Sequence, residues 1–306
     1  MTMHDRLHFE GKVAIITGAG QGLGRQHALL LASRGARVVV NDVGGDLRGG
    51  GYTAEVADQV VDLIRHQGGQ AVASYDSVLS GEKIVETALA TWGTLDIVVN
   101  NAGILRDSSF HKMTHEDWEQ VLQVHLHGCF RVTRAAWHVL REKGYGRIIM
   151  TTSAAGIYGN FGQANYAAAK MGIIGLAQSL AIEGRSRQIH VNCIAPIAGS
   201  RMTETILPAE VVADLKPEYV SSLVAWLCHA DCMESGSVFE VGAGYFSKLR
   251  WERSEGLRLP LAAADIPEAL VKSWPTVLDF SASDHPESAE DAFAPVLKQL
   301  RTHQAN

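Results

Sequence analysis

Short apolar runs alternate with longer helical stretches along most of this chain, and this alternation is the feature that most restricts its fold. Lys12–Thr17 (KVAIIT) and Arg37–Asp42 (RVVVND) each hold at least three adjacent apolar residues. Strands of this kind are buried on both faces, as in parallel sheets covered by helices. Such strands are expected at residues 12–17, 37–42, 70–75, 95–99, 146–152, 189–195 and 237–241. The chain is therefore predicted to be an α/β protein with a doubly wound, seven-stranded parallel sheet.

The sequence between and after these strands predicts the domain organisation. Helices are expected at 23–33, 54–66, 82–91, 115–142 and 165–183, and the glycine-rich segment Gly44–Gly51 (GGDLRGGG) is expected to be a loop. From about residue 248 the alternation stops, and prolines separate short helical pieces. Residues 1–247 are therefore predicted to form one domain, and residues 248–306 a C-terminal extension that packs on it.

Composition and charge exclude several classes of protein. The net charge of −6 argues against a nucleic-acid partner, because phosphate contacts need a basic face. No apolar run approaches the roughly 20 residues that span a bilayer, and the first twelve residues lack the apolar stretch of a signal peptide. We therefore expect no membrane contact and a cytoplasmic location.

The four cysteines fit a reducing compartment and carry no clear metal signature. They are scattered, and only Cys228 and Cys232 lie close together in sequence, with His229 between them. A zinc site needs four ligands and commonly uses tighter cysteine pairs. Buried packing is therefore favoured over metal binding, and no metal is expected.

The first strand leads into a glycine-rich turn, Thr17–Gly24 (TGAGQGLG). Glycines allow a tight turn and let a pyrophosphate approach the backbone at a helix N-terminus, where free N–H groups favour negative charge. The position between a strand and a helix near the N-terminus is the context that supports a dinucleotide site in a Rossmann fold. The predicted cofactor-binding residues here are Gly18, Gln21, Gly22, Leu23 and Gly24.

Polar residues at the ends of the next strands extend the predicted cofactor site. Asp42 ends the second strand, where a carboxylate can bind the adenosine ribose and repel a 2′-phosphate, so NAD is favoured over NADP. Arg25 and Arg48 could instead bind a phosphate, and Asp42 could be a strand-end cap. Further polar residues follow the third and fourth strands, at the edge where ligands bind in open α/β sheets. The predicted residues there are Asp76, Ser77 and Asn101.

Tyr166 and Lys170 (YAAAK) stand four residues apart on one predicted helix, so their side chains share a face. A phenol with a pKa of about 10 is a poor base at neutral pH, and a neighbouring cation favours the phenolate. Ser153, just past the fifth strand, could hydrogen-bond the same substrate oxygen or simply cap a helix. These residues together predict acid–base chemistry on an alcohol or a ketone, with Ser153 and Tyr166 contacting the substrate.

The combination resembles the short-chain dehydrogenase/reductase family through TGAGQGLG, NNAG (Asn100–Gly103), Ser153 and YAAAK. The resemblance implies that Tyr166 is the general acid/base, that Lys170 holds the nicotinamide ribose, and that Ser153 orients the carbonyl. It also implies a place beside the nicotinamide for a short loop after the sixth strand. The residues of this loop are Ala198, Gly199 and Ser200.

His125 departs from the family pattern, which usually has an asparagine at this point of the long helix. In the family that asparagine completes a proton relay. A histidine can accept and donate protons, so it could relay them itself. It could equally be a packing residue in the core, and the sequence leaves both roles open.

Longer stretches, among them VVVNDVGGDLRGGG, VHLHGCFRVTRAAW and FEVGAGYFSKLRWER, resemble one branch of this family. That branch is the (3R)-hydroxyacyl-CoA dehydrogenases, which include the dehydrogenase unit of peroxisomal multifunctional enzyme type 2. The resemblance implies NAD-dependent oxidation of a (3R)-3-hydroxyacyl-CoA, with a 17β-hydroxysteroid or a steroid-side-chain acyl-CoA as the alternative substrate. It also implies a homodimer paired through the helices that begin near residues 115 and 165.

Two further expectations complete the sequence-based interpretation. No hydratase domain or peroxisomal tripeptide is seen before the chain ends in Gln-Ala-Asn, so a free-standing cytoplasmic enzyme is expected. A protein that binds NAD as a sensor or scaffold, without turnover, is the more distant alternative. Retention of Ser153, Tyr166 and Lys170 together favours the enzyme.

Overall fold

The computed structural model describes residues 6–198, 208, 214–261 and 265–304 of the chain. The chain divides into two compact units, Met1–Lys248 and Leu249–Asn306. This division lies one residue from the boundary that the sequence predicts. Each unit is described by itself, and packing of the extension on the first unit stays a prediction.

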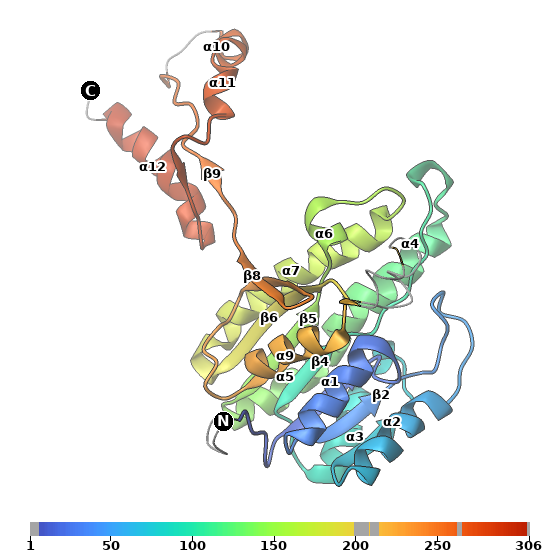
Figure 1. Ribbon diagram of the computed structural model, residues 1–306. Coiled ribbons are helices and arrows are strands. Elements are labelled where there is room, and N and C mark those ends of the chain that lie inside the picture. The colour runs from blue at the N-terminus through green and yellow to red at the C-terminus, as the bar shows by residue number, and fades with distance from the viewer. Residues whose placement is uncertain (1–5, 199–207, 209–213, 262–264, 305–306) are drawn as a thin grey trace. The chain divides into compact units, whose positions relative to one another are not determined.

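The first unit is built on one sheet with the strand order β3-β2-β1-β4-β5-β6-β7-β8 (Figure 1). Neighbouring strands from β1 to β7 run parallel. The seven predicted strands are confirmed, because their apolar runs are buried along most of their length. Their bounds are β1 Val13–Thr17, β2 Arg37–Asn41, β3 Gln70–Ser74, β4 Ile97–Asn100, β5 Gly146–Thr151, β6 Ile189–Pro196 and β7 Val238–Gly242.

An eighth strand, β8 (Tyr245–Leu249), was not predicted, so the seven-stranded sheet is corrected to eight strands. β7 and β8 are joined by Ala243 and Gly244, which have φ angles of 48° and 81°. Two residues at positive φ make a tight hairpin turn, which joins antiparallel strands. The turn lacks the Asn-Gly or Asp-Gly pair that signals such hairpins in a sequence.

Helices cover both faces of the sheet. α1, α2 and α9 lie on one face, while α3, α5 and α7 lie on the other, with α4 packed against α7 (Figure 1). Four of the five predicted helices are present within a few residues, the fifth is divided into α4 and α5, and α9 and the short α6 were not predicted. Their bounds are α1 Gly22–Ser33, α2 Glu55–His66, α3 Gly81–Trp92, α4 His115–Leu122, α5 Gly128–Lys143, α6 Ala154–Tyr158, α7 Ala164–Gly184 and α9 Pro217–Cys228.

The predicted helix over 115–142 is not a continuous α-helix. A π-helical turn, Gln123–His127, separates α4 from α5. Such turns hold one extra residue per turn and recur at functional sites. This one carries His125, and the periodicity of apolar residues did not reveal it.

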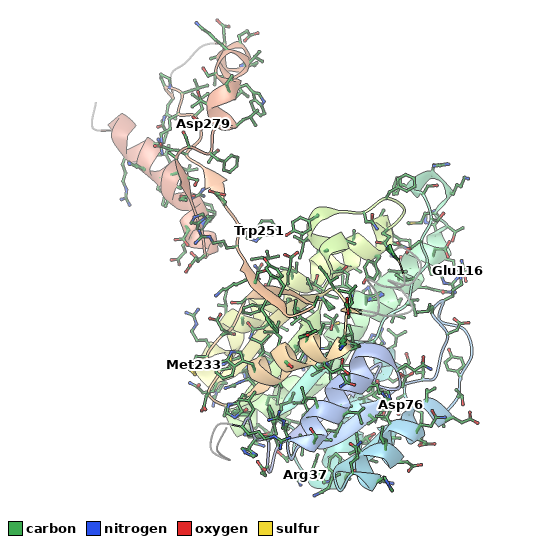
Figure 2. All side chains as sticks on the ribbon, in the orientation of Figure 1. Arg37, Asp76, Glu116, Met233, Trp251 and Asp279 are labelled. Atoms are coloured by element: carbon green, nitrogen blue, oxygen red, sulfur yellow. The ribbon has the colours of Figure 1, made fainter. Side chains whose placement is uncertain are left out.

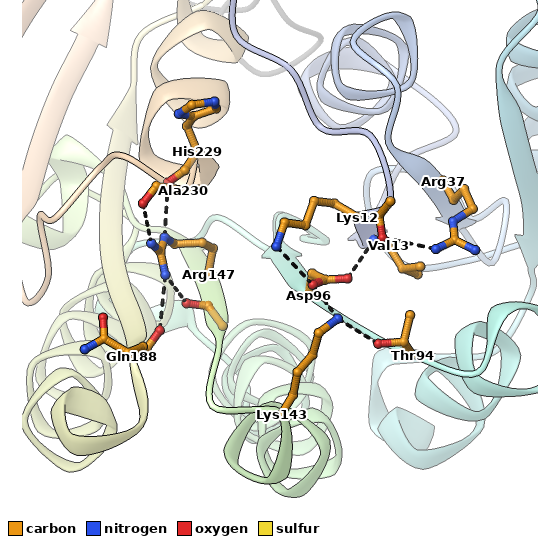
Figure 3. Close-up of polar contacts among 12 residues, drawn as sticks. Lys12, Val13, Arg37, Thr94, Asp96, Lys143, Arg147, Gln188, His229 and Ala230 are labelled. Carbon is orange, nitrogen blue, oxygen red and sulfur yellow. Dashed lines mark hydrogen bonds and ion pairs between the residues drawn. The ribbon is translucent and has the colours of Figure 1, made fainter.

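Polar contacts at the amino ends of the strands tie the sheet together (Figure 3). The fully buried Asp96 accepts a hydrogen bond from the backbone N–H of Val13 at 3.0 Å. Its other oxygen forms ion pairs with Lys12 at 3.5 Å and Lys143 at 2.6 Å. Val13 begins β1, Lys12 directly precedes it, and Lys143 lies at the end of α5. Asp96 therefore links its own segment to two others that are distant in sequence.

Arg147, near the start of β5, makes a second set of contacts at this edge. Its buried guanidinium donates to the carbonyls of Gln188 at 3.1 Å, Ala230 at 3.0 Å and His229 at 3.3 Å (Figure 3). These bonds join β5 to the segment before β6 and to the end of α9. Polar contacts of Asp96 and Arg147 therefore join neighbouring segments at the amino edge of the sheet.

In its described residues, the second unit contains a two-stranded antiparallel sheet and three helices. β9 (Arg253–Ser254) pairs with β10 (Ser283–Asp284), and the Arg253 guanidinium donates to both oxygens of Asp284, at 2.9 and 2.7 Å. The helices are α10 Ile266–Lys272, α11 Trp274–Val277 and α12 Ala289–Gln304. Its described side chains are exposed or half-buried, including Trp251, which is labelled in Figure 2.

His27 is buried between α1 and α9 in the first unit. Its Nδ1 lies 2.7 Å from Oγ of Ser221, and its Nε2 has no hydrogen-bond partner among the described residues. Burial lowers the pKa of His27 to about 3, because a charged ring there would lose its hydration. The folded protein therefore holds this imidazole neutral.

This burial predicts a loss of stability in acid. Between about pH 6.5 and pH 3 the unfolded chain binds a proton at His27 that the folded chain excludes. The free energy of unfolding should fall by up to about 1.4 kcal/mol per pH unit from this group. Denaturant unfolding between pH 7.5 and 5 should show a shallower decline for His27→Gln than for the wild type. His66→Gln, at the exposed end of α2, is the control; equal declines in His27→Gln and wild type would contradict the prediction.

Candidate active site

A cleft with a volume of about 1050 Å³ opens at the carboxyl ends of the strands. Almost all the site residues predicted from the sequence line it, although they come from eight separate segments. Gly24 lies behind the lining, and Gly199 and Ser200 fall outside the described residues. The predicted residues in the lining are Gly18, Gln21, Gly22, Leu23, Asp42, Asp76, Ser77, Asn101, His125, Ser153, Tyr166, Lys170 and Ala198.

The glycine turn forms one wall of the cleft at the start of α1. Gly18 and Gly22 have φ angles of 62° and 54°, which favour glycine. A Cβ on Gly24 would collide with the carbonyl of Gly18, so this glycine lets α1 pack closely on the turn. A Cβ on Gly22 would point into open space.

The N-terminus of α1 fits an anionic group. Its N-cap residue, Gln21, makes no side-chain capping bond, and its first turn has no acidic residue. The first-turn N–H groups of any helix lack intrahelical acceptors, and the helix dipole favours negative charge beside them. The residues present therefore fit the pyrophosphate of a dinucleotide.

Asn101, after β4, holds the glycine turn in place. Its amide donates to the carbonyls of Thr17 and Gly18, both at 3.1 Å. The Thr17 hydroxyl in turn accepts from the backbone N–H groups of Asn101 at 3.0 Å and Ala102 at 3.1 Å. Asn101 thus shapes the cofactor wall by joining the ends of β1 and β4.

Asp42 stands at the end of β2, beside the same wall. Its two oxygens accept from the backbone N–H groups of Gly20 at 2.8 Å and Gly44 at 2.7 Å. Each carboxylate oxygen can accept a second hydrogen bond, so the side chain can still bind hydroxyl groups. Asp76 and Ser77, which directly follow β3, also line the cleft. Asp76 is labelled in Figure 2.

Tyr166 and Lys170 lie on one face of α7, at the floor of the cleft. Both are buried, with 9% and 3% of their surface exposed. The Lys170 ammonium donates to the carbonyl of Thr151 at 2.6 Å and lies 5.4 Å from the centroid of the Tyr166 ring. The turn from β5 into α6 therefore holds the lysine beside the tyrosine.

Ser153 caps a helix, which is one of the two roles that the sequence left open, and its contact with a substrate oxygen stays a prediction. Its hydroxyl accepts from the backbone N–H of Ala155 at 3.2 Å and caps α6. It also hydrogen-bonds the phenol of Tyr166. The cap therefore fixes the hydroxyl at the point where it meets the tyrosine.

Burial governs the titration of this pair. It raises the pKa of Tyr166 to about 12, although the hydrogen bond from Ser153 acts in the opposite direction. It lowers the pKa of Lys170 to about 8. The sequence suggested that the lysine lowers the pKa of Tyr166. In the chain by itself, desolvation is the larger effect, so the phenol is protonated at neutral pH.

His125 lies at the same floor, with 1% of its surface exposed. Its Nε2 is 2.8 Å from the carbonyl oxygen of Ile104 and 3.1 Å from the backbone nitrogen of that residue. The ring meets the Tyr166 ring edge-on, with centroids 5.0 Å apart. Burial and the charge of Lys170 hold the pKa of His125 well below its usual value, and Nδ1 has no partner among the described residues.

The sequence did not identify three other segments that line the cleft. Residues 43–52 border the cofactor side, while residues 103–107 and 158–163 border the region beside Tyr166. The glycine-rich segment was predicted only as a loop. Its position directly after Asp42 was the available signal for a role at the cofactor.

Comparison with known proteins identifies the family. The model described as short chain dehydrogenase matches residues 12–210. The chain belongs to the short-chain dehydrogenase family. It is an oxidoreductase that acts on CH–OH groups, and its cofactor is a nicotinamide dinucleotide.

Individual members of the family resemble this dehydrogenase over nearly its whole length. Peroxisomal multifunctional enzyme type 2 of Mus musculus is 55% identical over 299 residues, which cover 97% of this chain and 41% of the mouse protein. The structure of the full-length Drosophila melanogaster enzyme of that name has a TM-score of 0.83 and 43% identity, covering 97% of this chain and 50% of that one. This dehydrogenase therefore spans half or less of the length of these two relatives.

A second solved structure is informative about ligands in the family. It is 7α-hydroxysteroid dehydrogenase complexed with NADH and 7-oxo glycochenodeoxycholic acid. It is 29% identical to this dehydrogenase with a TM-score of 0.70, covering 80% of this chain and 98% of that one. Within the described parts of this dehydrogenase, the helices are too short or too polar to cross a membrane.

The hydrogen bond between Ser153 and Tyr166 predicts a shift in the pH profile. Ser153→Ala removes an interaction that lowers the pKa of the phenol, so that pKa should rise. The oxidation rate, which needs the phenolate, should then begin its increase at higher pH, and kcat at pH 7.5 should fall about 100-fold. Initial rates from pH 6 to 10 test this, with Ser179→Ala on the exposed side of α7 as control. An unshifted profile in Ser153→Ala would rule out this role.

Proposed function

We propose that this dehydrogenase oxidises (3R)-3-hydroxyacyl-CoA to 3-oxoacyl-CoA with NAD. The observation that carries the alcohol chemistry is the convergence of Ser153, Tyr166 and Lys170 at the floor of the cleft. Similarity to peroxisomal multifunctional enzyme type 2 over 97% of the chain supports the choice of substrate.

The proposed mechanism divides the work among these three side chains. Ser153 and Tyr166 hold the substrate hydroxyl by hydrogen bonds, and the Tyr166 phenolate removes its proton. Lys170 stabilises the phenolate through its charge, which the buried site leaves poorly screened. The nicotinamide of a bound cofactor would supply the acceptor for the hydride that leaves the carbinol carbon. The alcohol thus loses a proton to Tyr166 and a hydride to the cofactor, and becomes a ketone.

The preference for NAD rests on Asp42. Its carboxylate faces the cleft one strand away from the glycine turn. A negative charge there attracts ribose hydroxyls by hydrogen bonding and repels a 2′-phosphate. Arg48 lies near in sequence, but Asp42 is held at the wall by the backbone of Gly20 and Gly44.

The substrate side of the cleft supports an apolar group next to the carbinol. Ile104, Leu105, Val124 and Phe161 line it together with Tyr166. An acyl chain or a steroid skeleton could pack against such a wall. The similarity to a hydroxysteroid dehydrogenase keeps a 17β-hydroxysteroid or a steroid-side-chain acyl-CoA as the second candidate substrate.

We assign His125 a positioning role in this mechanism. One ring nitrogen is engaged by Ile104, and burial keeps the imidazole neutral. To relay a proton, the imidazole would have to take up a proton on one ring nitrogen and release a proton from the other. Its edge-on contact with Tyr166 instead supports the orientation of the phenol.

Assembly and location extend the proposal. Exposed apolar side chains on α5 and α7, including Phe130 and Ile182, support a homodimer formed through these helices. The curated relative from mouse is named as a peroxisomal enzyme, so its name does not support the cytoplasmic location expected from the sequence.

Replacement of the acid/base residue tests the reaction. Tyr166→Phe keeps the ring beside His125 and removes the phenol oxygen, so turnover should fall at least 1,000-fold while NADH still binds. NADH formation on 3-hydroxyacyl-CoAs of rising chain length, beside 17β-hydroxysteroids, also identifies the substrate. Tyr75→Phe, outside the cleft, is the control. Turnover of steroids alone would contradict the acyl-CoA proposal, and wild-type protein inactive on every alcohol would contradict the reaction itself.

Replacement of Asp42 tests the choice of cofactor. Asp42→Asn keeps one acceptor oxygen but loses the charge, so the KM for NAD should rise about tenfold and discrimination against NADP should weaken. Steady-state rates with both cofactors measure the two effects. Asp62→Asn, exposed on α2, is the matched control. A wild type that prefers NADP would refute the assignment.

A further inference from the structure

The loop 44–53, next to Asp42, is a folded element of the cofactor wall. Its residues Asp46 and Gly49 line the cleft, and Asp46 organises the tip. One oxygen of the Asp46 carboxylate accepts from the backbone N–H groups of Arg48 at 2.7 Å and Gly50 at 2.9 Å. These hydrogen bonds give the tip of the loop a defined internal structure.

Only two described hydrogen bonds fasten the tip of this loop to the far side of the cleft. The backbone N–H of Leu105 donates to the carbonyl of Leu47 at 2.8 Å. The Nε of Arg106 donates to the carbonyl of Arg48 at 3.0 Å. Arg106 thus supplies the side-chain contact that joins the loop to the segment after β4.

The guanidinium of Arg106 is held in this position by the start of α4. It lies 3.4 Å from an Asp117 oxygen, and both groups are about one-fifth exposed. The other Asp117 oxygen accepts from the Thr114 hydroxyl at 2.8 Å, and that hydroxyl caps the helix. The carboxylate is therefore fixed before it meets the arginine.

The main chain of Arg106 is tied to the catalytic helix. The buried amide of Asn165 donates to the carbonyls of Arg106 and Asp117, both at 3.1 Å. Its oxygen accepts from the backbone N–H of Tyr166 at 2.8 Å. Hydrogen bonds therefore connect the cofactor loop, Arg106, Asn165 and the residue that performs the chemistry.

We propose that Arg106 is a positioning residue that latches the loop 44–53 against the catalytic side of the cleft and so controls cofactor release. The loop borders the cofactor, and Arg106 is the side chain that spans to it. Loss of the latch should leave Tyr166 and Lys170 in place, because Asn165 binds the Arg106 main chain and not its guanidinium. The expected defect is in the hold on the cofactor and not in the chemical step.

The test measures dissociation of NADH from the full-length protein by stopped-flow fluorescence. Arg106→Gln should accelerate dissociation about tenfold and raise the KM for NAD by a similar factor, with kcat reduced less than threefold or increased. Arg106→Lys can reach only one of the two acceptors, so its rate should be intermediate. Arg65→Gln is the matched control, because its Nε donates to the carbonyl of Ala71 at 3.1 Å, away from the cleft.

Asp117→Asn gives an independent variant, since it loosens the guanidinium without changing Arg106. It should accelerate NADH dissociation in the same direction as Arg106→Gln, by a smaller factor. Dissociation rates within twofold of wild type in both variants would overturn the proposal, as would a change equal to that of Arg65→Gln. NADH binding requires no alcohol, so this result is separate from failure of the acyl-CoA proposal. If NADH does not bind to the wild type, the dissociation rates of NADPH from the same variants test the role of Arg106.

Discussion

Burial of the Lys170 ammonium beside Tyr166 is the constraint on which the rest of the site depends. Its pKa of about 8 means that between pH 8 and 10.5 the unfolded chain holds a proton that the folded chain releases. The cation therefore costs folding free energy at neutral pH, and stability rises as pH increases through that window. The Thr151 carbonyl offsets part of the cost. The turn between β5 and α6, which also places Ser153, is consequently part of the chemical machinery.

Polar contacts join the strands at the amino edge of the sheet, whereas the cleft lies at the carboxyl edge. At the amino edge, Asp96 and Arg147 are buried with several partners each, so the strands are joined by satisfied polar contacts. At the carboxyl edge, Thr151 and His125 keep buried polar atoms with no partner among the described residues. A buried polar atom without a partner is costly in a fold, and Thr151 and His125 line the cleft, where a ligand could supply that partner. Tyr145, directly before β5 at the amino edge, also keeps such an atom.

The sequence predicted those parts of the structure that depend on local pattern. The strands could be predicted because a parallel sheet needs unbroken apolar runs. Asp42 was singled out because it ends such a run, and Tyr166 and Lys170 because their four-residue spacing puts them on one helix face. β8 was missed because Ala243-Gly244 is an unusual hairpin pair. The π-helical turn at His125 and the high pKa of Tyr166 were missed because they arise from hydrogen bonding and burial among distant segments. The contacts of Arg106 with Arg48 and Asn165 join residues more than fifty positions apart, which no local pattern shows.

The energetics of the site also separate an enzyme from a protein that only binds the dinucleotide. Under the proposed function, binding alone would use the glycine turn, Asn101 and Asp42, whose described hydrogen bonds are with backbone groups. Binding does not need an ammonium and a phenol side by side in a buried place. There the Lys170 ammonium loses its hydration, and the Tyr166 phenol ionises less readily. Burial pushes the pKa values of the two groups apart, to about 12 for Tyr166 and about 8 for Lys170, and pairs of titratable groups displaced in this way are typical of acid–base sites. Burial of the Tyr166–Lys170 pair therefore lowers the stability of the fold, and the pair is explained by catalysis and not by dinucleotide binding.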